Sequence, residues 1–322
     1  MGTLGSKWGM TCAMTTPVPR RALGRSGELV SILGLGGYHL GTIGAEREAV
    51  RLVHEAIDAG ITFMDNAWEY HDGRSEEVMG RAIAGRRGKV FLMTKVCTHG
   101  RAAGVAMRQL EQSLRRLRTD YLDLWQVHEV VYANDPERHF AAGGVIEALE
   151  RAKKQGKVRY VGFTGHKDPD IHLRMLSYDY PFDACQLPIN AFDATFRSFE
   201  QRVLPELRRR GIGVIGMKSM SGEGDAVRRR VLTAREALGY AMSVPGVATT
   251  VSGIDSRKVL RQNLRIARGF RPMSTSAMQK LRRRCADLAA DGRYELFKTT
   301  AKHDGAIGRT QHGFPPMEAV AR

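Results

Sequence analysis

Four polar side chains in the first half of the chain have the types and spacing that chemistry on a carbonyl group would need. Asp65, Lys95 and His128 each close a short run of apolar residues, and Tyr70 follows Asp65 by five positions in the loop "NAWEYHDG". Taken singly, each has an ordinary structural explanation, such as a helix cap for the aspartate or packing for the tyrosine. Together they are the set that proton-coupled carbonyl chemistry requires.

The elements that must position these residues follow from an alternation of two patterns. Short apolar, β-branched runs predict strands, and each is followed by a helical pattern. The predicted strands cover residues 30–37, 61–67, 89–96, 121–128, 158–165, 183–190, 212–219 and 248–254. The predicted helices cover residues 46–59, 75–85, 103–117, 145–156, 169–177, 202–211, 233–243 and 258–268.

Eight strand–helix units in a row predict an α/β fold, a closed (β/α)8 TIM barrel. A doubly wound sheet needs about six strands and a switch point, and would leave strands here unexplained. In such barrels reactive groups lie at the carboxyl ends of the strands. Asp65, Lys95 and His128 end three consecutive strands, so we expect them in one sector of the rim, with Tyr70 beside them.

The "GIGVIG" stretch at residues 211–216 satisfies a dinucleotide-binding spacing but has the wrong context for it. A helical pattern precedes it, and apolar residues lie inside it. We therefore interpret Gly211 as a helix C-cap and the remainder as the seventh barrel strand.

The two ends of the chain lie outside this alternation. Residues 1–19 are expected to be a flexible leader; Gly2 and Ser6 fit a myristoylation pattern that is common by chance. Residues 20–297 are expected to form one barrel domain, with an N-terminal hairpin, which could plug its bottom, and an extra C-terminal helix. Residues 298–322 are interpreted as a tail that either covers the mouth or is disordered.

Composition excludes several other classes of protein. The 322 residues carry a net charge of +16, but the arginine runs lie on or beside helical patterns, and no nucleic-acid-binding motif accompanies them. No apolar stretch approaches the length of a membrane helix, and no secretory signal is present. The four cysteines lie far apart in sequence. We expect a cytoplasmic protein with no membrane, nucleic-acid or metal partner, and the sequence leaves the oligomeric state open.

Several motifs resemble the aldo-keto reductase superfamily, over about Arg21 to Ala267. They are "ITFMDNAWEY" with "GRSEEVMGRAI", "VFLMTK", "YLDLWQVH" and the opening "LGRSGELVSILGLGG". The resemblance implies that Tyr70 donates a proton to the substrate carbonyl, that Lys95 lowers the pKa of Tyr70, and that Asp65 pairs with Lys95. It implies that His128 orients or polarises the carbonyl, while a nicotinamide supplies the hydride.

The same resemblance implies cofactor contacts after the later strands. Thr164 and Gln186 would hold the nicotinamide amide, although the family's usual Ser-Asn pair is replaced here by Thr164 and Gly165. The pyrophosphate and adenosine phosphate would contact Met217, Lys218, Ser219, Gly253, Asp255, Ser256, Arg257, Gln262 and Asn263. Gly253 and Val259 stand where the family has basic residues, and Asp255 could favour a free 2′-hydroxyl. NADP(H) is the favoured cofactor, with NAD(H) as the alternative.

A small carbonyl substrate would enter over Trp68, Tyr132 and His166. The leading hypothesis is an NAD(P)H-dependent reductase of aldehydes or ketones. A second hypothesis keeps the fold and the cofactor but makes the barrel a redox-sensing regulatory subunit with little turnover. A third makes Lys95 a Schiff-base nucleophile of an aldolase, which Asp65 argues against because a charged partner keeps the amine protonated.

Overall fold

The computed structural model describes residues 16–97 and 101–305. The expectations for Gly2, Ser6, most of the leader and residues 306–322 of the tail lie outside the described residues. Eight parallel strands form a closed barrel in the order β10-β3-β4-β5-β6-β7-β8-β9. These strands are β3 (Leu33–Gly36), β4 (Phe63–Asp65), β5 (Phe91–Val96), β6 (Leu122–Val127), β7 (Val158–Thr164), β8 (Ala184–Pro188), β9 (Gly213–Met217) and β10 (Val247–Gly253).

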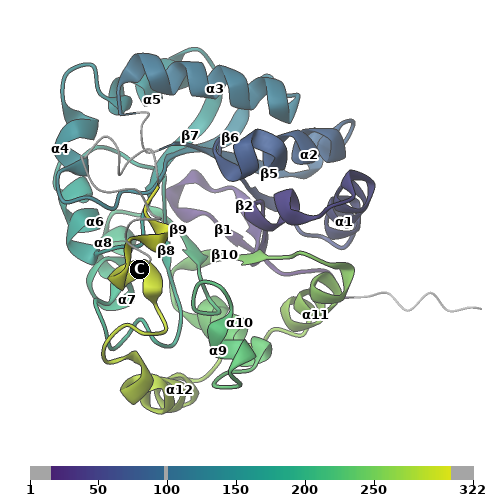
Figure 1. Cartoon of the computed structure of the whole chain (residues 1–322), viewed down its shortest axis with the longest axis vertical. Helices are drawn as coiled ribbons and strands as arrows, with labels where there is room; N and C mark the ends of the chain where they lie inside the picture. The colour runs from purple at the N-terminus through teal and green to yellow at the C-terminus, as the bar shows by residue number, and fades with distance from the viewer. Residues whose placement is uncertain (1–15, 98–100, 306–322) are drawn as a thin grey trace, which may run out of the picture.

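Helices surround the barrel on its outside (Figure 1). The helices Glu46–Asp58 and Ala103–Leu117, for example, each bury one face and leave charged residues on the other, as a helix that covers a sheet must. The helices are α1 (Glu46–Asp58), α2 (Arg74–Ile83), α3 (Ala103–Leu117), α4 (Asp135–Phe140), α5 (Val145–Lys154), α6 (Pro169–Leu176), α7 (Phe199–Arg202), α8 (Leu204–Arg209), α9 (Asp225–Arg228), α10 (Ala234–Ser243), α11 (Arg257–Arg268), α12 (Thr275–Ala289) and α13 (Leu296–Thr299).

The predicted (β/α)8 barrel and its hairpin are confirmed, with three local differences. The predicted strand 30–37 divides between the hairpin and the barrel. The predicted helix 202–211 is replaced by two short helices, α7 and α8; Pro205 lies in the first turn of α8, where its missing N–H costs nothing. The expected extra C-terminal helix, α12, ends at Ala289, and Gly292 at φ +73° separates it from α13.

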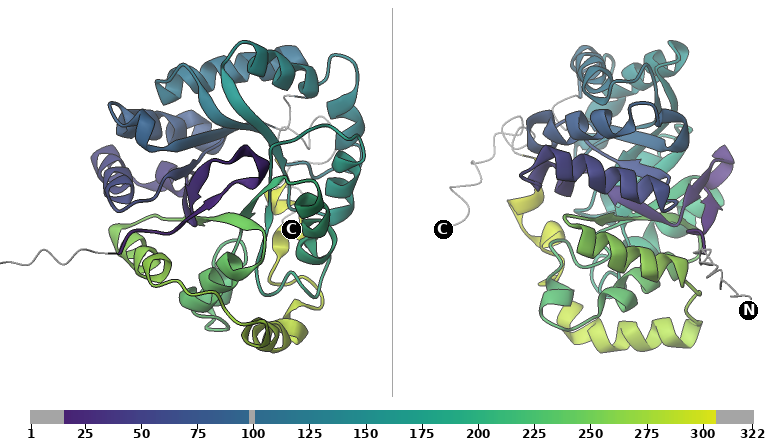
Figure 2. Two further views of the ribbon diagram at one scale, coloured as in Figure 1. Left: turned by 180° about the vertical axis from the view of Figure 1, so that it is seen from behind. Right: turned by 90° about the vertical axis from the view of Figure 1, so that its right-hand side faces the viewer.

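The hairpin formed by β1 (Arg20–Ala22) and β2 (Leu29–Ser31) closes the amino-terminal end of the barrel. Leu23 and Val30 pack into the apolar cluster inside the barrel. At the turn, Arg25 donates its backbone N–H to Gly211 O at 2.8 Å. Gly24 lies so close to the barrel that a Cβ there would lie 2.3 Å from Gly213 N. The C-terminal segment, residues 294–305, lies at the opposite end (Figure 2).

The "GIGVIG" stretch has the structure expected for it. Gly211 has φ +66° and follows α8, which ends at Arg209, and β9 begins at Gly213. Across the described ranges, no helix combines the length and apolarity needed to cross a lipid bilayer.

Candidate functional site

Lys95 is the centre of a buried hydrogen-bond cluster at the carboxyl ends of β4 and β5. Its ammonium donates to Asp65 Oδ1 at 2.6 Å, to the backbone oxygen of Asn66 at 2.6 Å and to Tyr70 Oη at 3.3 Å. The side chain is only 1% exposed. All three protons of the ammonium therefore have acceptors, which disfavours Lys95 as a free amine nucleophile.

Tyr70 lies above this lysine, in a tight turn of the loop after β4. The next two residues, His71 and Asp72, have φ of +51° and +55°. The phenol ring makes edge contacts with Tyr38, at 5.3 Å between ring centroids, and with His128, at 5.7 Å. The structure thus brings together all four residues that the sequence analysis grouped.

The electrostatic environment of Tyr70 is dominated by burial and by nearby acids. Burial raises its pKa well above the usual value, and the carboxylates of Asp65, Glu129 and Glu69 raise it further. The net shift of the Tyr70 pKa is therefore upward, because burial and these three acids dominate it, and the lowering contribution expected from Lys95 itself stays a prediction. The phenol consequently keeps its proton at neutral pH.

Glu69 and Glu129 are the acids that the sequence analysis missed. Glu69 immediately precedes Tyr70, and its Oε1 lies 2.6 Å from His128 Nδ1. Its other oxygen, Oε2, accepts a hydrogen bond from the Cys97 thiol at 2.7 Å. Glu129 directly follows His128 in a left-handed conformation, with φ +51°. The signal in the sequence was adjacency, since each acid neighbours a residue already identified.

These acids and His128 form an acid–base cluster. Polar atoms of Glu69, His128 and Glu129 lie within 4.8 Å of one another. The 2.6 Å between Glu69 Oε1 and His128 Nδ1 is an ion-pair distance, although the two atoms are not aligned as a hydrogen bond in this structure. Two atoms that bind the same metal ion, each about 2.1 Å from it, lie about 3 Å apart or more. The shorter distance between Glu69 Oε1 and His128 Nδ1 therefore does not fit a pair of metal ligands.

The next strand ends present buried polar groups. Thr164 and Gln186 are register partners on β7 and β8, and both are buried. Gln186 Nε2 donates to Asp65 Oδ1 at 3.3 Å, which joins this pair to the lysine cluster. Gln186 Oε1 and His166 Nε2 are buried and have no hydrogen-bond partner within the described part of the chain. They are free to bind an amide.

The surroundings of Gly165 explain why this chain has no asparagine at the second position of the Ser-Asn pair. A Cβ there would lie 2.3 Å from the backbone oxygen of Val130 and 2.7 Å from His172. An asparagine side chain would therefore displace the loop after β6. His166 is the next residue along the chain with a polar side chain.

The end of β9 carries Met217, Lys218 and Ser219. Lys218 has φ +55°, and its ammonium lies 5.0 Å from the centre of the Phe297 ring. Burial lowers the pKa of Lys218 to about 8, although Glu129 opposes that shift. Ser219 is buried, whereas Met217 is half-buried.

The loop after β10 leads into α11 with several groups already engaged. Ser256 caps α11 by accepting from the backbone N–H of Val259. Asp255 is exposed and raises the pKa of His39, although burial lowers that pKa overall. Gly253 is exposed and passes close to His39, since a Cβ there would lie 2.3 Å from the ring.

The other expected cofactor contacts, Arg257, Gln262 and Asn263, lie on α11 and differ in their surroundings. Arg257 pairs with Glu55 of α1 at 2.7 Å. Asn263 is buried and donates to Ser252 Oγ at 3.1 Å. Gln262 is exposed. Arg257 and Asn263 thus have structural partners, and Gln262 does not lie in the buried part of the site.

The three expected substrate contacts have different surroundings. Trp68 donates to Gln112 Oε1 at 2.6 Å and lies under Arg116, so it is anchored on α3. Tyr132 is buried, with the Arg101 guanidinium 5.8 Å from its ring centre. His166 is the third, and it faces the C-terminal segment.

The C-terminal segment, residues 294–305, covers the ends of β7 to β9. Phe297 makes an edge contact with His166, with 5.9 Å between ring centroids. Asp304 accepts from Lys167 at 2.8 Å. The described part of the predicted tail therefore covers part of the mouth.

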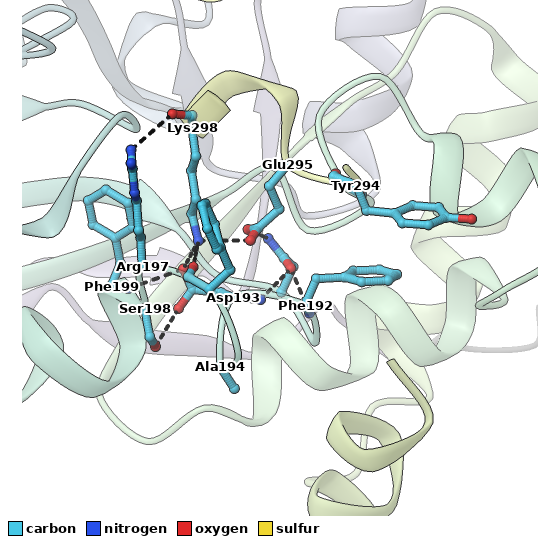
Figure 3. Close-up of polar contacts among 12 residues, drawn as sticks. Phe192, Asp193, Ala194, Arg197, Ser198, Phe199, Tyr294, Glu295 and Lys298 are labelled. Carbon is cyan, nitrogen blue, oxygen red and sulfur yellow. Dashed lines mark hydrogen bonds and ion pairs between the residues drawn. The ribbon is translucent and has the colours of Figure 1, made fainter. Parts of the chain in front are cut away.

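A fully buried ion cluster anchors this segment (Figure 3). The Lys298 ammonium donates to Asp193 Oδ1 at 2.7 Å, to Glu295 Oε2 at 2.8 Å and to the backbone oxygen of Phe196 at 2.7 Å. Asn190 donates to the other oxygen of Glu295 at 2.9 Å. The sequence analysis did not identify this cluster, because Asp193 and Lys298 lie 105 residues apart.

Known proteins resemble this chain over most of the barrel. The model of the aldo/keto reductase family matches residues 32–229. The uncharacterized oxidoreductase YrpG of Bacillus subtilis is 30% identical over 220 residues, 62% of this chain and 66% of the relative. The methylglyoxal reductase YeaE of Escherichia coli is 37% identical over 131 residues, 40% of this chain and 44% of the relative.

A solved structure extends the likeness further. An aldo/keto reductase from Klebsiella pneumoniae, in complex with NADP and acetate, superposes with a TM-score of 0.67 at 25% identity. The match covers 83% of this chain and 95% of that one. The curated relatives above are matched over about half to two thirds of their own length.

Proposed function

The chain belongs to the aldo/keto reductase family, and from this premise we propose that it reduces small aldehydes or ketones to alcohols with NAD(P)H, with Tyr70 as the proton donor. One observation carries the proposal. The Lys95 ammonium is buried and bonded to both Asp65 and Tyr70. Such an arrangement places a protonated phenol beside a fixed positive charge.

The proton step follows from this geometry. A bound nicotinamide cofactor would supply the hydride that reduces the carbonyl carbon. The carbonyl oxygen gains negative charge and takes the phenolic proton of Tyr70, which leaves a phenolate 3.3 Å from the Lys95 ammonium. Asp65 keeps that ammonium fixed, and His128 binds the carbonyl oxygen. The product is an alcohol, and Tyr70 regains its proton from solvent.

The cofactor would lie across the ends of β7 to β10. The buried Oε1 of Gln186 would accept from the nicotinamide amide, and Thr164 would support it. Met217, Lys218 and Ser219 would border the pyrophosphate. The NADP complex of the Klebsiella relative and the net charge of +16 support NADP(H).

The loop after β10 has features that weaken the argument for NADP(H) over NAD(H). Gly253 occupies a position that is basic in the family, and Arg257 is paired with Glu55. Of the other contacts expected there, Asp255 and Gln262 are exposed, whereas Ser256 caps α11. NAD(H) therefore remains the alternative cofactor.

NADPH consumption read at 340 nm tests the proposed function. A panel of small aldehydes and ketones, including methylglyoxal, is offered to the full chain, with a blank that lacks carbonyl. We expect turnover with at least one member of the panel. Tight NADPH binding without turnover would contradict the proposal and would favour the regulatory subunit considered from the sequence.

A further inference from the structure

The contact between Glu69 and His128 determines which ring nitrogen can serve the substrate. Glu69 Oε1 lies 2.6 Å from His128 Nδ1. His128 is 7% exposed. Nδ1 is therefore engaged by a carboxylate, and Nε2 is the nitrogen left to meet a carbonyl oxygen.

Strand β5 holds the backbone of His128 and the backbone next to Glu69 in place. His128 donates its backbone N–H to Val96 O at 3.0 Å, and Trp68 donates its own to Lys95 O at 3.1 Å. The second oxygen of Glu69 accepts from the Cys97 thiol at 2.7 Å. The carboxylate is thus fixed from two sides, so the contact follows from the architecture of the rim.

The proton count of this pair decides what Nε2 can do. A neutral imidazole carries one proton, and beside an ionised carboxylate that proton lies on Nδ1. Nε2 then has only a lone pair and cannot donate to a carbonyl oxygen. With one further proton in the pair, shared between Glu69 and Nδ1, Nε2 carries an N–H and can donate.

We propose that Glu69 is a positioning residue that makes carbonyl binding by His128 depend on one extra proton held by the Glu69–His128 pair. This inference rests on the proposed function. It assigns to Glu69 the control of a hydrogen bond that His128 makes, without contact between Glu69 and the substrate.

Other charged groups around His128 act in both directions. Burial lowers its pKa, Lys95 lowers it further, and Glu69 and Asp65 raise it. Glu129 and the Tyr70 phenol also face the pair. His166 lies close enough that a positive charge on His128 lowers the pKa of His166. The net shift of the His128 pKa is downward, because burial outweighs the two acids that raise it, Glu69 and Asp65.

The first test compares pH profiles of kcat/KM for the wild type and Glu69→Gln. The wild type should lose about tenfold per pH unit above the apparent pKa of the pair. The amide of the variant can donate to Nδ1, so the neutral imidazole keeps its proton on Nε2. We expect the loss to move at least one pH unit upward or to disappear. Glu77→Gln, at an exposed position of α2, is the matched control and should keep the wild-type profile.

The direction of the shift separates this role from two others. If Glu69 acted only as a charge near Tyr70, its removal would lower the pKa of that phenol and move the loss to lower pH. If it were merely structural, Glu69→Ala would lower kcat/KM by the same factor at every pH. Either outcome would overturn the proposal.

Histidine NMR supplies a readout that needs no turnover. The full chain is labelled with ¹⁵N at its ten histidines, and His128→Gln identifies the signal of interest. In the wild type we expect Nδ1 to stay protonated while Nε2 loses its proton as the pH rises, and in Glu69→Gln the neutral ring should be protonated at Nε2. A wild-type ring that is neutral and protonated at Nε2 would overturn the inference. An absence of carbonyl reduction would instead overturn the proposed function, and the NMR result would still decide the role of Glu69.

Discussion

At the scale of single residues, Lys95 connects the fold to the proposed chemistry. Its buried ammonium satisfies Asp65 and touches the phenol of Tyr70. A buried charge that loses its partner is costly, whereas an apolar pair of similar volume can be tolerated. Stability and activity at this position should therefore respond differently to paired substitutions.

Lys95→Met should leave Asp65 as an unpaired buried charge. We expect a loss of about 3–5 kcal/mol in the free energy of unfolding and a fall in kcat of about 10²-fold or more. The double variant Asp65→Asn/Lys95→Met should regain much of the stability and none of the activity. Urea unfolding and steady-state kinetics on both variants measure this, and recovery of activity in the double variant would contradict it.

The pair between Arg257 and Glu55 offers a test of cofactor preference. Glu55→Gln should release the Arg257 guanidinium for an adenosine 2′-phosphate. Because the pair is partly exposed, we expect NADPH to bind only about two- to fivefold more tightly. Fluorescence titration with NADPH and NADH in parallel measures this. An equal change for both cofactors would contradict a role of Arg257 at the 2′ position.

Sequence alone identified the four central residues but not their electrostatics. The positions of Asp65, Lys95 and His128 at strand ends could be predicted, because strand ends converge at the rim of a barrel. The direction of the Tyr70 pKa shift could not, because it depends on which loop side chains turn inward. Glu69 and Glu129 do so, and no periodicity marks them.

At the scale of elements, two segments cover the two ends of the barrel. The β1–β2 hairpin closes the amino-terminal end with Leu23 and Val30. Residues 294–305 cover the ends of β7 to β9, anchored by the Lys298 cluster. The hairpin could be predicted from its local turn, whereas the anchor joins residues too distant in sequence for any local pattern to reveal.

Leu23→Ala tests the hairpin as a structural plug. Truncating this fully buried side chain should cost about 2–5 kcal/mol in the free energy of unfolding. Leu29→Ala, at a position 62% exposed, is the matched control and should change it by less than about 0.5 kcal/mol. Because the hairpin lies at the end opposite the site, kcat/KM at a temperature where both variants stay folded should match the wild type. A selective loss of activity in Leu23→Ala would show that the hairpin does more than plug the barrel.

Glu295 gives the C-terminal anchor a pH dependence. Burial raises the pKa of Glu295 to about 7, although Lys298 opposes that shift. The folded state therefore disfavours its ionised form, and the stability of the wild type should fall as pH rises from about 4.5 to 7. Glu295→Gln lacks this ionisation, so its stability relative to the wild type should rise over that range by up to about 3 kcal/mol. Thermal unfolding at pH 5 and pH 8 measures the difference, with Glu48→Gln at an exposed site of α1 as control. A constant difference between Glu295→Gln and the wild type would contradict this origin.

At the scale of the whole molecule, the closed barrel converts separate strand ends into one site. Its eight units could be counted in the sequence, and α11 begins at Arg257, one residue before the predicted start. The predicted boundaries were wrong at residues 30–37, where one apolar run contributes to both a hairpin strand and a barrel strand. They were also wrong near Pro205, which lies in the first turn of a separate helix, α8. The fold was predictable because periodicity repeats along the chain. The sequence left open whether the C-terminal tail covers the mouth or is disordered, because that covering depends on contacts between residues distant in sequence.

The central claim is that this barrel reduces carbonyls with Tyr70 as its acid. The most direct measurement compares the wild type and Tyr70→Phe for NADPH oxidation with the best carbonyl substrate, alongside NADPH titration by fluorescence. We expect the variant to bind NADPH within about threefold of the wild type, because the ring remains, and to lose at least about 10²-fold in kcat, because the proton donor is gone. An unchanged kcat in Tyr70→Phe would contradict the assignment of Tyr70 as the proton donor.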